Sequence, residues 1–286
     1  MKLTHNYIIL AFLVLILGNL FATFVDIAVK VFASSGSIFQ YVLLRQGIML
    51  LLLLPFWLKL PTERRQAVAP KVYFTRALLT NIGAPTAVIA VLYLPLATAN
   101  VFFYSAPLFT LLLANLLLKE AMPKHRIMVT LAGFAGVIIA LKPEHFNLIG
   151  LVATVTALAV AGYNLSVRWL PPDTSTLSTL VWSNIFTIPI TGCIAIFYWQ
   201  PITQDILLLA LISCLFLGVY QACCIIAYQK AEAGAIVVAE YSGLIFAALF
   251  GWLLFDEAID MWTIVGILLI IFPIGWQSWY ERSRRQ

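Results

Sequence analysis

Long stretches of uncharged, apolar residues follow one another along almost the whole chain. Each is close to the ~20 helical residues needed to cross the ~30 Å hydrocarbon layer of a bilayer. Charged residues, proline and glycine divide the chain into ten of them, at residues 7–29, 38–58, 72–93, 97–118, 126–141, 147–169, 177–198, 206–229, 234–255 and 261–280. This pattern predicts an all-α integral membrane protein with ten transmembrane helices.

The composition excludes other classes of protein. Of the 286 residues, 63% are hydrophobic and 10% are charged, whereas soluble domains carry ~25% charged residues. So few charges cannot cover a water-facing surface, which excludes a soluble enzyme. A disordered chain is excluded because disorder needs low hydrophobicity and high charge. The first apolar stretch is longer than the ~7–15 residues of a secretory signal, so we interpret it as a retained first helix.

One boundary between predicted helices rests on length alone. The chain from Tyr73 to Leu118 is a single, nearly continuous apolar stretch. A single helix of that length does not fit the hydrocarbon layer. We therefore expect the chain to fold back in a tight turn at Leu94-Pro95-Leu96.

Lysine and arginine are distributed unevenly between the segments that connect the predicted helices. With the N-terminus inside, 13 of them lie in cytoplasmic segments, and the outer segments hold Lys30 and Lys142. Because cytoplasmic loops are enriched in basic residues, this bias favours an even number of crossings and two cytoplasmic termini. The net charge of +5 then reflects orientation, and we expect no nucleic-acid partner.

The sequence repeats itself at an offset of 137 residues. Residues 90–121 match residues 227–258 at 10 of 32 positions, including Tyr104-Ser105 with Tyr241-Ser242 and Glu120 with Glu257. The match places the fourth predicted helix on the ninth. An odd number of crossings per copy turns the second copy upside down, so we predict two inverted five-helix repeats, residues 1–143 and 144–286. Inverted repeats with a substrate site near the midplane are a recurrent plan of secondary transporters.

Several short motifs are shared with a known family. In the first half they are Phe21-Ala22-Thr23 with Asp26 and Lys30, Phe39-Gln40 with Arg45, Arg76, Leu94-Pro95-Leu96-Ala97, Ala106-Pro107-Leu108-Phe109, Leu117-Leu118-Lys119-Glu120 and Gly133-Phe134-Ala135-Gly136-Val137. In the second half they are Ala227-Tyr228, Glu240-Tyr241 and Gly251-Trp252-Leu253-Leu254-Phe255-Asp256-Glu257.

With these motifs the chain resembles the EamA family of the drug/metabolite transporter superfamily, over nearly its whole length. It is most similar to the branch of S-adenosylmethionine and riboflavin uptake carriers. That branch has Ala-Pro-Phe before the Glu-Tyr pair, where this chain has Val237-Val238-Ala239. The resemblance implies a bacterial inner-membrane carrier in which helices 1–4 and 6–9 surround a cavity. It also implies a small-molecule substrate and no cofactor.

Four ionisable residues fall inside predicted helices, where such groups are rare and either paired or facing a cavity. For Asp26 and Arg45, one interpretation is an ion pair of Asp26 with Lys30 or Arg45. The other is that Arg45 binds a carboxylate or phosphate of the substrate. For Arg76 and Glu240, one interpretation is a structural pair between neighbouring helices. The other is a cytoplasmic gate or coupling site at which Glu240 changes its protonation during transport.

Neutral polar residues near the predicted midplane are candidates for a substrate cavity. Single amides in a helix bundle often only bond to a neighbouring helix, but together these residues can bind a polar molecule that contains a ring. The predicted cavity residues are Asn19, Arg45, Asn81, Tyr104, Gln221 and Tyr241, and the predicted gate or coupling residues are Asp26, Arg76 and Glu240.

Three functions compete for such a chain. A secondary transporter of a small polar or amphiphilic metabolite would be driven by a coupling proton or by a counter-substrate, because the chain has no nucleotide-binding GxxxxGK[ST] motif. A membrane-embedded enzyme needs a nucleophile, a metal cluster or a carboxylate pair. The sequence shows no such catalytic or metal-binding set. The third function is that of a channel, or of a lipid or drug exporter of related fold. As to oligomeric state, the sequence is compatible with a homodimer.

Overall fold

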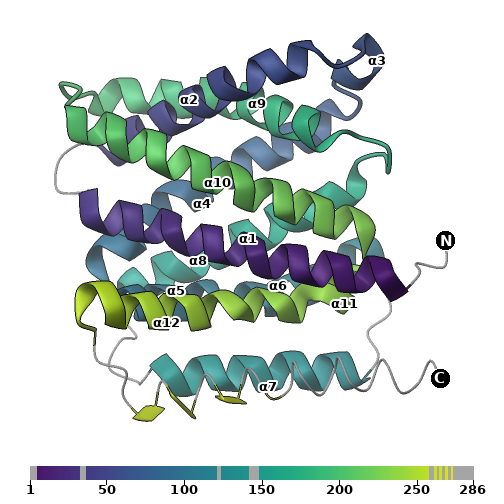
Figure 1. Cartoon of the computed structure of the whole chain (residues 1–286), viewed down its shortest axis with the longest axis vertical. Helices are drawn as coiled ribbons and strands as arrows, with labels where there is room; N and C mark the ends of the chain where they lie inside the picture. Colours follow the sequence, from purple (N-terminus) through teal and green to yellow (C-terminus); the bar gives the residue numbers. More distant parts are fainter. Residues whose placement is uncertain are drawn as a thin grey trace.

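The computed structural model describes residues 5–32, 37–120, 124–141 and 148–257, with a few more between 261 and 272. The elements in these ranges form a bundle of helices that lie side by side (Figure 1). In chain order they are α1 (His5–Phe32), α2 (Ile38–Leu58), α3 (Thr62–Arg65), α4 (Pro70–Tyr93), α5 (Leu96–Phe103), α6 (Ala106–Leu118), α7 (Lys124–Leu141), α8 (Leu148–Leu165), the 3-10 turn η2 (Ser166–Trp169), α9 (Thr176–Ala195), η3 (Ile196–Tyr198), α10 (Gln204–Lys230), α11 (Ala233–Ile236), η4 (Val237–Tyr241) and α12 (Ser242–Phe255).

The described part of the chain contains 8 segments long and apolar enough to cross a membrane. They coincide with the first four and the sixth to ninth predicted crossings. The fifth predicted crossing is helix α7, whereas the tenth, residues 261–280, lies mostly outside the described residues. So does the predicted boundary between the halves at residue 143.

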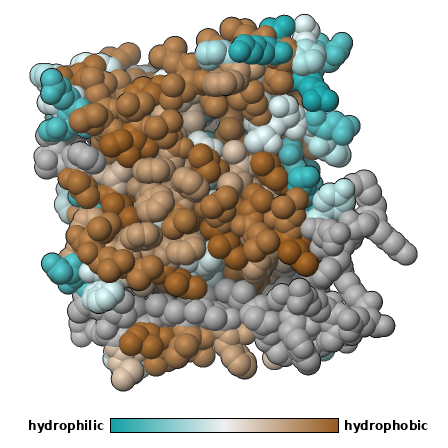
Figure 2. All heavy atoms as spheres, viewed as in Figure 1, coloured by the Kyte–Doolittle hydropathy of each residue, from teal (hydrophilic) through white to brown (hydrophobic). Residues whose placement is uncertain are grey.

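The outer surface of the bundle is apolar. Figure 2 shows hydrophobic atoms across the middle of the bundle and hydrophilic atoms gathered toward its ends. Leu51 is 69% exposed and Leu116 is 71% exposed. Apolar surface of this extent is unfavourable in water but is what lipid requires, and helices satisfy all backbone polar groups within the lipid. The chain is an all-α integral membrane protein.

The fold-back predicted near residue 95 is confirmed. Helix α4 ends at Tyr93, and α5 begins at Leu96 after a two-residue connection. Leu94 is extended, with φ −117° and ψ 155°, as expected for a residue that precedes proline. Pro95 is the N-cap of α5.

Two of the crossings are interrupted near their middle. The fourth crossing divides into α5 and α6 at Tyr104-Ser105. The ninth divides into α11 and α12, which are separated by the 3-10 turn η4 at Val237–Tyr241, although no proline is present there. Asn19 compensates by donating from Nδ2 to the carbonyl oxygens of Ala239 (3.0 Å) and Glu240 (3.2 Å). A side chain from α1 thus satisfies backbone groups that the interrupted helix leaves free.

The two interrupted crossings also end in the same way. Lys119 after α6 and Asp256 after α12 are left-handed, with φ 54° and φ 51°. The N–H of the following residue, Glu120 or Glu257, bonds back to the helix at Ala114 (3.2 Å) or Gly251 (3.1 Å). A left-handed residue after the last turn, with an N–H bonded back into the helix, is a common way for a helix to end. All of these positions are related by the offset of 137 found in the sequence.

The main helix contacts join the first half of the chain to the second. Helix α1 packs along α10, α4 packs along α8, and α2 packs against α9. By their order in the two halves, α1 corresponds to α8, α4 to α10 and α2 to α9. Exchange of the halves therefore converts the α1–α10 contact into the α4–α8 contact and leaves the α2–α9 contact unchanged. The same exchange relates the α1–α12 contact to the α8–α6 contact.

The closest approach at the interruptions is between Gly243 and Tyr104. A Cβ atom on Gly243 would lie 1.7 Å from Tyr104 Oη and 3.3 Å from Asn19 Cβ. We expect Gly243→Ala to displace Tyr104 and lower the melting temperature of the purified protein by roughly 5 °C, as for an overpacked core. Gly47→Ala is the control, because no atom lies within 4 Å of its added Cβ. Equal melting temperatures for the two variants would contradict this packing.

Candidate functional site

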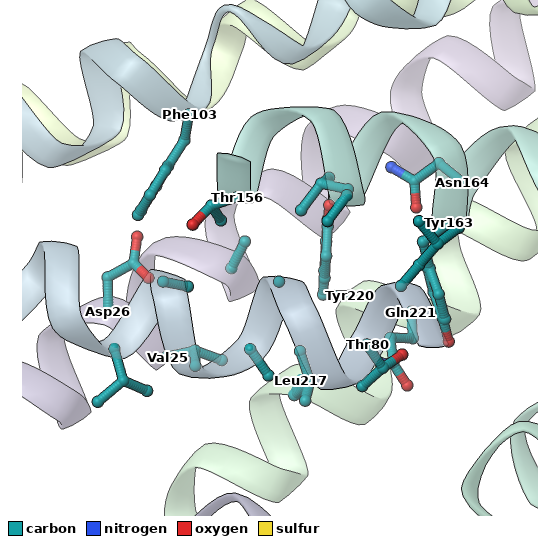
Figure 3. Close-up of a pocket in the computed structure, with 18 of the residues that line it drawn as sticks. Val25, Asp26, Thr80, Phe103, Thr156, Tyr163, Asn164, Leu217, Tyr220 and Gln221 are labelled. Carbon is teal, nitrogen blue, oxygen red and sulfur yellow. The ribbon is translucent and has the colours of Figure 1, made fainter. Parts of the chain in front are cut away.

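A cavity of ≈ 200 Å³ lies inside the bundle, lined by residues from both halves (Figure 3). The first half contributes residues of α1, α2, α4, α5 and α6, and the second contributes residues of α8, α9, α10 and η4. Apolar atoms make up most of the wall surface, and about half of the lining residues also carry a polar group. Such a wall is typical of sites for small organic molecules.

The cavity brings together six of the nine predicted site residues. They are Asn19, Asp26, Arg45, Tyr104, Gln221 and Glu240. Figure 3 shows Asp26, Phe103 and Thr156 toward one end of the cavity and Tyr163, Asn164 and Gln221 toward the other. The cavity therefore has two polar regions separated by a more apolar middle.

Asp26 and Arg45 lie in the first polar region. Asp26 Oδ2 accepts a hydrogen bond of 3.0 Å from Asn100 Nδ2, and Arg45 Nη1 donates to the hydroxyl of Tyr41 at 3.2 Å. The expectation that Asp26 pairs with Lys30 or Arg45 is wrong. Lys30 pairs with Glu257 instead, because the end of α1 lies beside the end of α12. Asp26 and Arg45 face the same cavity without a hydrogen bond between them.

Glu240 lies in the second polar region, on the interrupted crossing. Its Oε1 accepts a hydrogen bond from the hydroxyl of Tyr228 and a longer one, 3.5 Å, from Asn164 Nδ2. The Glu240 side chain is buried. A carboxylate with neutral donors as its partners stays available to a proton or to a cationic substrate.

Arg76 does not pair with Glu240. Its Nε donates to Ser183 at 2.9 Å, and its Nη1 donates to the carbonyl oxygen of Tyr163 at 2.8 Å and to Ser166 at 3.0 Å. The guanidinium also lies 3.7 Å from the centre of the Tyr163 ring. Arg76 is fully buried and is not part of the cavity wall. In this structure it joins α4 to α8 and α9.

Asn81 and Tyr241 are also absent from the cavity wall. Asn81 Nδ2 donates to Ala77 at 2.9 Å, and its Oδ1 accepts from Thr191 at 2.7 Å. Tyr241 donates from its hydroxyl to the carbonyl oxygen of Thr130 on α7, at 3.2 Å. Both side chains therefore bond between helices.

Several wall residues were not predicted as site residues. They include Gln46, Thr156, Tyr163 and Tyr220. The sequence carried no signal for them, because most helices here are apolar on every side. A polar side chain in such a helix is visible in the sequence, but the direction in which it points is not.

Among the residues that the structure describes, two ion pairs join the halves of the chain, one at each end of the bundle. Lys30, in the last turn of α1, binds Glu257 after α12, and Glu257 Oε1 also accepts the Leu96 N–H at 2.8 Å. Arg168 of η2 lies 3.3 Å from Glu120, which follows α6. Glu120 and Glu257 are repeat-related, and Lys30 and Arg168 lie at corresponding helix ends. Within the described ranges, no group of three or more His, Cys, Asp or Glu side chains forms a metal site.

Comparison with known proteins identifies relatives along the whole chain. The model of the EamA-like transporter family matches residues 9–142 and 148–276. An S-adenosylmethionine uptake transporter of Rickettsia bellii is 30% identical over 229 residues, 77% of either chain. A riboflavin transporter of Vibrio cholerae is 27% identical over 220 residues (75% of this chain and 74% of the relative). A pseudopaline exporter of Pseudomonas aeruginosa is 28% identical over 199 residues (64% and 66%).

The fold has a match among solved structures. One crystal structure superposes with a TM-score of 0.73 at 16% sequence identity, covering 98% of this chain and 99% of the other. The family model accounts for most of the chain and matches it twice, once in each half. Its members transport small metabolites and are not enzymes. The chain is a member of the EamA-like transporter family.

Proposed function

We propose that this protein is a secondary transporter that carries a small polar or amphiphilic organic metabolite by alternating access. Residues 1–143 and 144–286 form two inverted five-helix repeats in the inner membrane, with both termini in the cytoplasm. The central cavity binds the substrate. One repeat rocks against the other so that the cavity opens to each side in turn.

The contacts between helices support the inverted repeats. The pairs α1–α10 and α4–α8 exchange when the halves are exchanged, and α2–α9 is its own counterpart. A twofold relationship requires this reciprocity, in which residue i contacts j and j contacts i. The interrupted fourth and ninth crossings, with matching left-handed ends, support the same arrangement.

The observation that carries the proposal is that each end of the bundle has an ion pair between the halves. Lys30–Glu257 and Glu120–Arg168 each join one half to the other, and the cavity lies between them. The end that opens must separate the halves, so the ion pair at that end must break. Opening of the whole path at once would break both pairs, whereas alternating access breaks one at a time.

We assign Glu240 and Asp26 as the residues through which transport is coupled to a proton or a counter-substrate. Both carboxylates line the cavity, and each is held by a neutral amide. Asn19, Tyr104 and Gln221 also line the cavity and supply polar contacts to the substrate. Arg76, Asn81 and Tyr241 then act by holding the helices around it.

Transport by the purified protein in liposomes tests the proposal. S-adenosylmethionine is the first candidate substrate, since relatives that carry it are 28–30% identical, and riboflavin is the second. We expect uptake of labelled S-adenosylmethionine above that of protein-free liposomes, saturating with concentration. A conductance that does not saturate would identify a channel, and chemical conversion of the compound would identify an enzyme.

A further inference from the structure

Arg45 is a buried arginine with little to bind within the protein. Its side chain is 5% exposed and lines the cavity. Its hydrogen bond to Tyr41 uses Nη1, and its guanidinium lies 5.1 Å from the centre of the Tyr41 ring. Its Nε has no hydrogen-bond partner among the described residues. A buried cation with an unmatched donor lowers the stability of the fold. We therefore expect Arg45 to serve binding and not stability.

The surroundings of Arg45 supply no carboxylate in contact. Asp26 is near enough to interact with Arg45 electrostatically, but its hydrogen bond is to Asn100. The side-chain amide of the neighbouring residue, Gln46, lies 2.9 Å from the hydroxyl of Thr191. That hydroxyl donates its one hydrogen to Asn81 Oδ1 at 2.7 Å, so the Gln46 amide is the donor to Thr191 and has its partner there. Arg45 is therefore the residue of this part of α2 that brings an unmatched donor to the cavity.

Arg76 provides an internal comparison. It is also fully buried, but its Nε and Nη1 make three hydrogen bonds and its guanidinium stacks on Tyr163, which leaves only Nη2 without a partner. It lies outside the cavity wall. Arg76 is thus held by three hydrogen bonds from the protein, whereas Arg45 has one, to Tyr41.

We propose that Arg45 forms the subsite for a carboxylate of the substrate, and that Asp26 receives a cationic amine next to it. The edge of the guanidinium left free by Tyr41, Nε with Nη2, suits a bidentate carboxylate. The substrate class is therefore a zwitterionic metabolite of the amino-acid type. This inference rests on the transport function proposed above.

The first test needs no ligand and compares Arg45→Met with Arg76→Met in purified protein. Removing a cation whose partner is the substrate leaves the melting temperature of the unliganded protein unchanged or raises it. Removing Arg76 breaks three hydrogen bonds and lowers it by roughly 5–10 °C. An equal fall for Arg45→Met would show that Arg45 is a structural residue and would overturn the subsite.

The second test uses S-adenosylmethionine and its decarboxylated form as matched probes in liposomes. We expect wild-type protein to bind the carboxylated form ~10- to 100-fold more tightly, the range for a hydrogen bond to a charged group, and Arg45→Met to lose this preference. Transport of both forms with equal affinity would leave the transport function intact and refute the carboxylate subsite. Transport of neither form would count against S-adenosylmethionine as the substrate, and the melting comparison would then decide the subsite alone.

Discussion

Glu240→Gln is expected to abolish transport while the protein still folds. Glutamine has the shape of glutamate and can accept the hydrogen bonds that Tyr228 and Asn164 donate to Oε1. It cannot exchange a proton or hold a cation, so the coupling step is lost. We expect uptake into liposomes to fall at least ~100-fold, the upper range for a hydrogen bond to a charged group, with the melting temperature nearly unchanged.

Glu63→Gln is the matched control for that variant. Glu63 lies in the short helix α3, outside the predicted crossings, and is exposed. Its loss of charge should leave transport unchanged. Wild-type uptake by Glu240→Gln would rule out the assignment of Glu240 as a coupling residue. A large fall in its melting temperature would instead assign Glu240 a structural role.

Cross-linking of either ion pair is expected to stop transport completely. The two double variants are Lys30→Cys with Glu257→Cys, and Glu120→Cys with Arg168→Cys. Each replaces a contact between the halves with a covalent bridge, so that end of the path can no longer open. Uptake should fall to the level of protein-free liposomes after treatment with a short bis-thiosulfonate reagent and return on reduction.

Two controls make the cross-linking decisive. Cys193 is exposed, so the experiments use a Cys193→Ser background in which the reagent has no other accessible thiol among the described cysteines. Each single-cysteine variant, treated with the reagent, should keep its transport. Persistent uptake through a fully cross-linked double variant would contradict alternating access at these two gates.

The membrane architecture could be predicted from the sequence because it depends on composition along the chain. Lipid requires ~20 apolar residues per crossing whatever the neighbouring helices are, so eight of the predicted crossings recur as candidate spans. The fold-back at Pro95 follows from the same length argument. The repeat of Tyr104-Ser105 and Tyr241-Ser242 could also be read directly, because both copies kept the same residues at the same offset.

The partners of the polar residues could not be predicted in this way. Lys30 is four residues from Asp26, one turn along the same helix, yet it binds Glu257, 227 positions away. Arg76 and Glu240 were candidates for a pair, but each is bonded to other side chains. Uniformly apolar helices carry no periodic pattern that shows which face is turned inward.

The sequence by itself determined the number and length of the described crossings and the presence of two related halves, because these follow from hydrophobic length and from duplication. The tertiary structure alone decided which polar side chains share the cavity, where the ninth crossing is interrupted, and that Arg45 faces the cavity with Nε unmatched. These depend on the rotation and packing of each helix against partners distant in sequence. In lipid that packing is set by close contacts and hydrogen bonds between helices, and a hydrophobic pattern does not encode them.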